Sequence, residues 1–254
     1  MIHAFLLIGQ SNAAGRGCIS EAETLNTNAG KLKVLRNGRW QTMFRPVNPD
    51  RSFSGTCLAE SFAKAYSDLH PDVEVGIIPC ADGGTTLLQW QPGELLFDNA
   101  VNCAKLAMRT AQLVGVLWHQ GEGDCGQNDY PLYYSRFQNI LHALRADLNL
   151  QDLPVLVGGL GDFLCDCEMS ADLVNYHHVN DALMRIVNDE ANCAFVSAEG
   201  LGANPDNLHF NADALKEFGL RYFDEYQKLI ASCDVLPCNE ITEIDHVRTE
   251  MELL

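Results

Sequence analysis

Five apolar segments, each separated from the next by a helical pattern, limit what this chain can fold into more than any other feature. They span Ile2–Gly9, Val73–Cys80, Leu113–Gln120, Pro154–Leu160 and Cys193–Ala198. Each is an almost continuous run of apolar residues rich in valine, isoleucine and leucine, which is typical of strands buried on both faces. Such strands form parallel sheets that helices cover on both sides. The sequence therefore predicts a three-layer α/β/α sandwich with a central, parallel, five-stranded sheet.

The segments between these strands carry apolar residues at helical spacing. We expect amphipathic helices over 58–69, 131–148 and 211–230, and another that begins near Asp98 and continues through Met108. Alternation of strands and helices implies right-handed crossovers and an open, doubly wound sheet. In such a sheet the ligand site lies beyond the carboxyl ends of the strands.

Two regions depart from the alternation. Residues 18–54 form a long polar stretch, which we expect to be an inserted loop region with weak strand candidates at Val34, Leu35 and Trp40. Residues 233–254 are acidic and weakly periodic, and we expect a peripheral appendage there. Because we find no repeat and no interdomain linker, we predict that residues 1–254 form a single domain.

The net charge of the chain argues against polyanionic partners. Lys and Arg total 17 and Asp and Glu total 34, so the formal net charge is −17. Nucleic acids and anionic membranes bind basic surfaces, so neither partner is expected. The first apolar run, Ala4–Ile8, is too short for a membrane span or a secretion signal. We expect a soluble, cytoplasmic protein that binds a small molecule or an oligosaccharide, and the oligomeric state stays open.

Ten cysteines are spread through the chain, several of them inside apolar stretches. Disulfide scaffolds concentrate cysteines in short chains, so we expect reduced thiols here. Four cysteines could in principle bind zinc, namely Cys165, Cys167, Cys233 and Cys238. Their spacing matches no familiar zinc motif, so no metal is expected.

Two strands end in glycine-containing segments that suit acyl transfer. Ser11 directly follows the first strand, between Gly9 and Gly15, where a nucleophile would be exposed. The segment approximates a nucleophile elbow, although Ala13 stands where its last glycine should be. The second strand leads to Gly83-Gly84, whose backbone N–H groups could stabilise an oxyanion. Ordinary strand-to-loop turns are the alternative interpretation of both segments.

The end of the third strand is unusually polar, with His119, Gln120, Glu122 and Asp124 in succession. These side chains could be metal ligands, but no second histidine cluster supports that hypothesis. A polar loop with one capping carboxylate is the structural alternative.

Asp206 and His209 follow the fifth strand, three residues apart. At that spacing the carboxylate can accept a hydrogen bond from Nδ1–H of His209 and leave Nε2 as a base. A simple turn with a capping histidine is the alternative. After the fourth strand, Gly159 begins a possible dinucleotide fingerprint, but Leu164 stands where its last glycine is required, so no cofactor is expected.

These segments resemble the motifs of a known family. The four segments are Gly9–Gly17, Gly83–Thr85, His119–Asp124 and Asp206–Phe210. They resemble the SGNH hydrolase superfamily, whose fold is flavodoxin-like. Within it they resemble the branch of sialate O-acetylesterases and family 6 carbohydrate esterases, the acetylxylan esterases. The motifs span residues 9–210, about four-fifths of the chain.

The resemblance implies a role for each matching residue. Ser11 would be the nucleophile, His209 the general base, and Asp206 the acid that orients His209. The oxyanion hole would consist of the N–H groups of Ser11 and Gly84 and the side-chain amide of Gln120, which takes the place of the superfamily's asparagine. Glu122 would be a second acid for His209 or a brace for the serine loop, and the sequence leaves both open.

Further residues would surround the substrate. We expect Gln10, Asn12, Arg16 and Trp90 there, with Asn12, Arg16 and Asp124 also bracing the site. Trp90 could stack on a sugar or belong to the core. One departure from the branch is an alanine in place of methionine two residues after the serine.

The resemblance implies a serine esterase that removes acetyl groups from an O-acetylated carbohydrate, of the acetylxylan or sialic acid type, without cofactor or metal. The acidic charge favours a neutral sugar. Three alternatives stay open: a lipid or thioester hydrolase of the same superfamily, a carbohydrate-binding relative without activity, and a metal-dependent enzyme.

Overall fold

The computed structural model describes residues 1–231 and 239–241. Six α-helices occur in this part of the chain: α1 Ser11–Ala14, α2 Leu58–Leu69, α3 Leu95–Ala107, α4 Tyr133–Leu148, α5 Tyr176–Asp189 and α6 Ala212–Ala231. The strands of the sheet are β1 Ile2–Gly9, β2 Leu32–Arg36, β3 Arg39–Thr42, β4 Glu74–Pro79, β5 Ala111–His119, β6 Val155–Gly158 and β7 Cys193–Val196. The expected appendage at 233–254 lies outside the described residues, apart from 239–241.

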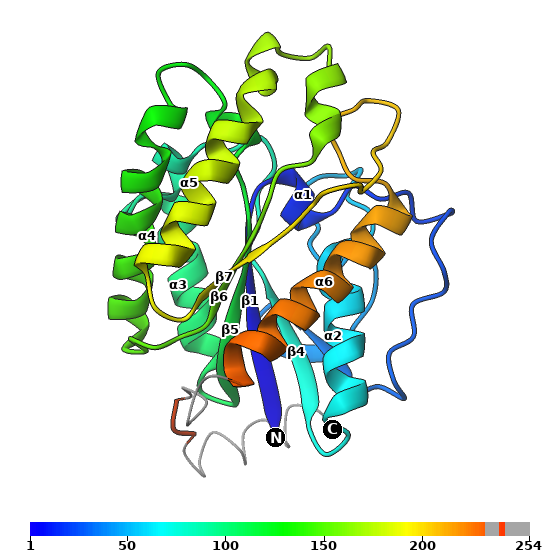
Figure 1. Ribbon diagram of the computed structural model, residues 1–254. Helices are drawn as coiled ribbons and strands as arrows, with labels where there is room; N and C mark the ends of the chain where they lie inside the picture. The colour runs from blue at the N-terminus through cyan, green and yellow to red at the C-terminus, as the bar shows by residue number, and fades with distance from the viewer. Residues whose placement is uncertain (232–238, 242–254) are drawn as a thin grey trace.

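The strands form a single sheet in the order β3-β2-β4-β1-β5-β6-β7. All neighbouring pairs are parallel except β2 and β3. Helices α2 and α6 pack on one face, and α3, α4 and α5 cover the other (Figure 1). The α/β/α sandwich predicted from the apolar segments is therefore confirmed. Strand β1 is central, and its carboxyl end faces the loops at the top of Figure 1.

The sheet has seven strands in the described residues, so the prediction of five was wrong. The two additional strands, β2 and β3, come from the expected loop region 18–54 and form an antiparallel hairpin at one edge. Asn37 and Gly38 connect them, and both have positive φ, 50° and 76°. Two residues with positive φ suit a tight hairpin turn, for which Asn-Gly is a strong sequence signal. The prediction overlooked that signal.

The expected helices are present, with small differences at their ends. Helix α5 was not assigned a range from the sequence, although Val179, Leu183 and Ile186 form its buried stripe. A short 3-10 turn, Tyr130–Leu132, precedes α4 and contains Pro131.

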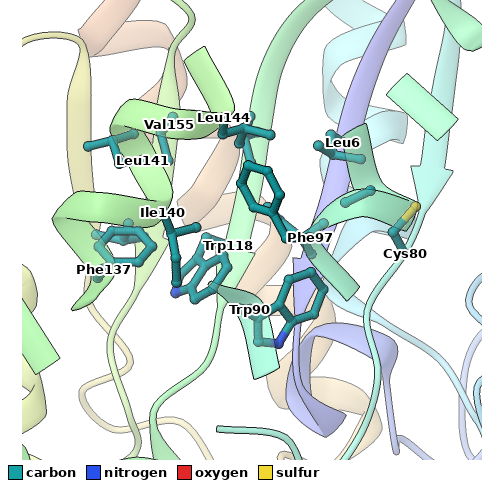
Figure 2. Close-up of a cluster of buried hydrophobic side chains, with 14 of the residues drawn as sticks. Leu6, Cys80, Trp90, Phe97, Trp118, Phe137, Ile140, Leu141, Leu144 and Val155 are labelled. Atoms are coloured by element: carbon teal, nitrogen blue, oxygen red, sulfur yellow. The ribbon is translucent and has the colours of Figure 1, made fainter. Parts of the chain in front are cut away.

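The largest buried side chains on the α3–α5 face surround β5. Figure 2 shows Trp90 and Trp118 among Phe97, Phe137 and Ile140. The two indoles meet edge to face, with their ring centroids 5.7 Å apart. None of the described helices is both long and apolar enough to cross a membrane.

Candidate active site

The position of Ser11 follows from the close contact between β1 and β5. Gly9 pairs with His119 at the carboxyl end of both strands, and its φ is +127°. A Cβ at Gly9 would lie 2.0 Å from the carbonyl oxygen of His119, so only glycine fits. The next N–H, of Gln10, donates to that same oxygen at 2.9 Å. Ser11 thus begins α1 directly above the centre of the sheet.

Ser11, His209 and Asp206 form a hydrogen-bonded chain. His209 Nε2 lies 3.0 Å from Ser11 Oγ, and His209 Nδ1 lies 2.7 Å from Asp206 Oδ2. Asp206 Oδ1 accepts hydrogen bonds from the backbone N–H groups of Leu208 and His209, at 3.0 Å each. The carboxylate therefore has a fixed orientation, and an Nδ1–H donor leaves Nε2 free to accept the hydroxyl proton.

These hydrogen bonds also determine the charge of the acid. Partial burial by itself raises the pKa of Asp206, but the hydrogen bond with His209 and those from the two backbone N–H groups outweigh it. The pKa of Asp206 consequently lies below its usual value. An ionised carboxylate is what an imidazole needs in order to accept a proton during a reaction.

Asn12 joins α1 to the segment Leu208–Phe210, which we call the histidine loop. Its Nδ2 donates to Glu122 Oε1 at 2.5 Å and to the carbonyl of Leu208 at 3.1 Å, while its Oδ1 accepts from the N–H of Phe210 at 3.0 Å. Among the described residues no hydrogen bond or ion pair joins Glu122 to His209, and its contact with Asn12 is that of a brace. Asn12 is 1% exposed and does not line the pocket, so the prediction that it binds substrate was wrong.

Two backbone N–H groups of residues that line the pocket could donate to an oxyanion. The N–H groups of Ser11 and Gly84 have no acceptor among the described residues, and both residues line the same pocket. Gly83 approaches Ser11 so closely that a Cβ there would lie 3.3 Å from Ser11 Cβ. The Gly83 N–H is held by Asp50 Oδ2 at 2.9 Å, which fixes this loop.

The side-chain amide of Gln120 is not available to the pocket. It is fully buried, and its Nε2 donates to Asp124 Oδ2 at 2.6 Å and to the carbonyl of Thr85 at 3.1 Å. An amide nitrogen has two protons, so both are used. The prediction that Gln120 completes an oxyanion hole is therefore contradicted by its hydrogen bonds. Asp124, predicted to brace the site, does so through this contact and one from Leu87 N–H at 2.8 Å.

In the described part of the chain, the amide oxygen of Gln10 is occupied by hydrogen bonds and its amide nitrogen is free, which is the opposite of Gln120. Gln10 Oε1 accepts hydrogen bonds from Gly121 N–H at 3.3 Å and Gly123 N–H at 3.1 Å. These two backbone donors fix the orientation of the amide. Its Nε2 has no acceptor among the described residues, and Gln10 lines the pocket. Of the two glutamines, Gln10 is the one with a donor to offer a ligand.

Arg16 is held by a carboxylate that the sequence analysis did not identify. Its Nη1 and Nη2 donate to Asp50 Oδ1 and Oδ2 at 3.0 and 2.7 Å, and both side chains are almost fully buried. Burial raises the pKa of Asp50, but Arg16, Ser54 and the Gly83 N–H together lower it below its usual value. Through Asp50, Arg16 therefore braces the segment that contains Gly83, and it also lines the pocket.

The pocket above Ser11 has a volume of about 430 Å³. Its lining comes from six parts of the chain: Gln10, Ser11, Arg16, Arg51, Phe53, Gly83, Gly84, Glu122, Gly123, Met169, Ser170, Leu173, Leu208 and His209. Trp90 is not among them. It is 1% exposed, and its Nε1 donates to Thr85 Oγ1 at 3.0 Å, so of the two alternatives for Trp90 the structure shows the core position and not a position at the pocket. The aromatic side chain that does line the pocket is Phe53, which belongs to none of the motifs identified in the sequence.

No group of three or more potential metal ligands occurs in the part of the chain that is described. His119 lies 3.9 Å from Glu122 Oε1, and its Nε2 contacts the carbonyl of Gly159 at 3.2 Å. Burial lowers the pKa of His119. The eight described cysteines are free thiols. The zinc hypothesis also involved Cys233 and Cys238, which lie outside the described residues.

An open α/β sheet that carries a serine, a histidine and an aspartate in hydrogen-bonded order at its carboxyl edge suits a carboxylic ester hydrolase. A family model described as "Carbohydrate esterase, sialic acid-specific acetylesterase" matches residues 1–228, and the chain belongs to this family. A protein of Arabidopsis thaliana named "Probable carbohydrate esterase" is 28% identical over 248 residues, which cover 87% of this chain and 89% of that protein.

Solved structures have the same fold. The crystal structure of an Arabidopsis thaliana protein is 25% identical, with a TM-score of 0.78 over 89% of this chain and 98% of that chain. NanS gives a TM-score of 0.70 at 18% identity, over 89% and 97% of the two chains. A carbohydrate acetylesterase from Xanthomonas citri gives 0.65 at 16% identity, over 92% of this chain and 57% of that one.

Proposed function

We propose that this carbohydrate esterase hydrolyses acetyl esters of a neutral sugar through an acetyl-enzyme formed on Ser11. The observation that carries the proposal is the hydrogen-bonded chain from Ser11 through His209 to Asp206, at the floor of a pocket where two backbone N–H groups lack acceptors. A nucleophile, a base with its orienting acid, and oxyanion donors are the parts that acyl transfer requires.

In the proposed reaction, His209 Nε2 takes the proton of Ser11 as Oγ attacks the acetyl carbonyl carbon. The carbonyl π electrons move to the oxygen, where the N–H groups of Ser11 and Gly84 donate to it. When the tetrahedral intermediate collapses, the bond to the sugar oxygen breaks, and His209 gives its proton to that oxygen. Water then attacks the acetyl-enzyme with the same proton transfers, releasing acetate and restoring Ser11.

We also propose that Gln10 Nε2 is the third oxyanion donor, in place of Gln120. The bonds to Gln10 Oε1 hold the amide so that Nε2 is the only polar atom of this side chain left for a ligand. A donor that is fixed before the reaction loses little free energy on binding the oxyanion.

The charges around the pocket favour a sugar without a carboxylate. Arg16 is paired with Asp50, and Arg51 Nη1 lies 2.7 Å from Asp82 Oδ1. Glu122 adds another carboxyl group to the lining. A sialic acid carboxylate would thus meet cations that already have anionic partners, and it would lie near further acidic groups.

The test measures release of the carboxylic acid, which is acetate from acetylated xylan, O-acetylated sialic acid and an acetyl thioester and fatty acid from a triacylglycerol, with Ser11→Ala as the blank. We expect the highest kcat/KM for the acetylated xylan and no activity above background in the variant. Preference for the lipid or thioester would reject the substrate class. Full activity of Ser11→Ala would reject the mechanism. Carbohydrate binding without acetate release would indicate a binding protein.

A further inference from the structure

Phe53 lies at the catalytic pocket but takes no part in the chemistry described above. Its side chain lines the pocket, yet the residue is 68% exposed to solvent. Burial of a phenylalanine ring stabilises a fold, so a ring left in water contributes little to folding. A single exposed aromatic residue is common on protein surfaces. The orientation of this ring and the groups around it distinguish Phe53 from such residues.

The guanidinium group of Arg16 packs against the Phe53 ring. The guanidinium carbon of Arg16 lies 5.2 Å from the centre of the ring, and Arg16 is itself fixed by two hydrogen bonds to Asp50. The backbone that carries the ring is closed into a turn, because Arg51 N–H donates to Ser54 Oγ at 3.0 Å and Ser54 Oγ donates to Asp50 Oδ1 at 2.7 Å. A ligand that packs on the ring therefore does not have to order it first.

The surroundings of Phe53 offer apolar contact. Met169, which is 71% exposed, and Leu173 line the same pocket from the segment before α5, and Leu208 lines it from the histidine loop. The guanidinium groups that share the pocket are paired with carboxylates, as described above. Packing against apolar surface is therefore the main interaction open to the alcohol part of a substrate.

We propose that Phe53 determines specificity by packing against the C–H face of the pyranose ring whose acetyl group lies at Ser11. This inference rests on the proposed function and names what recognises the sugar in the same site. A pyranose has an apolar C–H face and hydroxyl edges, and a flat aromatic ring complements that face. An acyclic alcohol of two carbons offers too little surface for the same contact.

The experiment compares two acetyl esters that differ in the alcohol, a mono-O-acetylated methyl xylopyranoside and ethyl acetate. The measured quantity is the ratio of kcat/KM for the sugar ester to kcat/KM for ethyl acetate. We expect Phe53→Ala to lower this ratio about tenfold, mainly through a higher KM for the sugar ester. Phe53→Trp retains an aromatic face, so we expect it to keep the ratio within about twofold of the wild-type value.

Phe44 provides a matched control. It is 45% exposed, and the guanidinium carbon of Arg36 lies 5.1 Å from its ring centre, but it does not line the pocket. Phe44→Ala should leave the ratio unchanged. An unchanged ratio in Phe53→Ala, or an equal fall in Phe44→Ala, would overturn the inference. A wild-type protein that cleaves neither ester would overturn the proposed function instead, so the two failures are distinguishable.

Discussion

Replacing Asp206 by asparagine tests which acid serves His209. The two backbone N–H groups that donate to Asp206 Oδ1 should hold the Oδ1 of the new asparagine in the same place. The amide Nδ2 must then face His209 Nδ1, where the wild type has Oδ2 at 2.7 Å. Two donors cannot share that contact, so Nδ1 loses its proton and Nε2 gains one. An Nε2 that carries a proton cannot accept one from Ser11.

With His209 protonated on Nε2, kcat/KM should fall by about 10³-fold. We expect this rather than a larger loss because the Asp206 side chain is partly exposed to solvent. Since each tenfold loss is about 1.36 kcal/mol, this is about 4 kcal/mol of transition-state stabilisation. Hydrolysis of 4-nitrophenyl acetate by both proteins measures it, with unfolding midpoints as a check on folding.

Glu122→Gln is the matched control. A glutamine Oε1 can still accept the hydrogen bond from Asn12 Nδ2, so we expect a loss of less than about tenfold. An equal loss in Glu122→Gln and Asp206→Asn would refute the reasoning. A loss below about tenfold in Asp206→Asn would refute it as well.

Two further predictions concern Gln10 and Asp50. Gln10→Glu keeps an acceptor for Gly121 and Gly123 but replaces the Nε2 donor by oxygen, so kcat should fall about 10²–10³-fold with 4-nitrophenyl acetate. A loss below about threefold would exclude Gln10 from the oxyanion hole. The pKa of Asp50 is lowered in the folded protein, so its ionised form stabilises the fold. That contribution is fully present above the usual pKa of an aspartate, about 4, and is lost as the pH falls through the lowered pKa. Thermal unfolding midpoints between about pH 5 and pH 2 should therefore fall more steeply for the wild type than for Asp50→Asn, and parallel curves would contradict this.

The strands could be predicted because buried parallel strands have a distinctive composition. Ile2–Gly9 was predicted with the bounds that the structure shows, since all residues of β1 except His3 are buried. The hairpin of β2 and β3 lies at the sheet edge, where polar residues such as Arg39 are tolerated, and its strands lack that signal. The weak strand candidates Val34, Leu35 and Trp40 and the turn at Asn37 and Gly38 were the indications of it.

Side-chain orientation limited the prediction of the site. The sequence places Gln10 and Gln120 at the ends of neighbouring strands, and both could donate to an oxyanion. Which of the two has a free donor depends on Asp124, whose carboxylate accepts a hydrogen bond from the amide of Gln120. The contact between Arg16 and Asp50 likewise joins residues 34 positions apart through a loop of irregular backbone, where no periodicity predicts partners.

Covalent labelling tests the central claim most directly. The protein is treated with a serine-directed fluorophosphonate, and its peptides are analysed by mass spectrometry. We predict one equivalent of adduct on Ser11, loss of esterase activity in proportion to labelling, and no adduct in Ser11→Ala, because His209 activates that hydroxyl alone. An active enzyme that is labelled at another residue, or that stays fully active with Ser11 modified, would contradict the account.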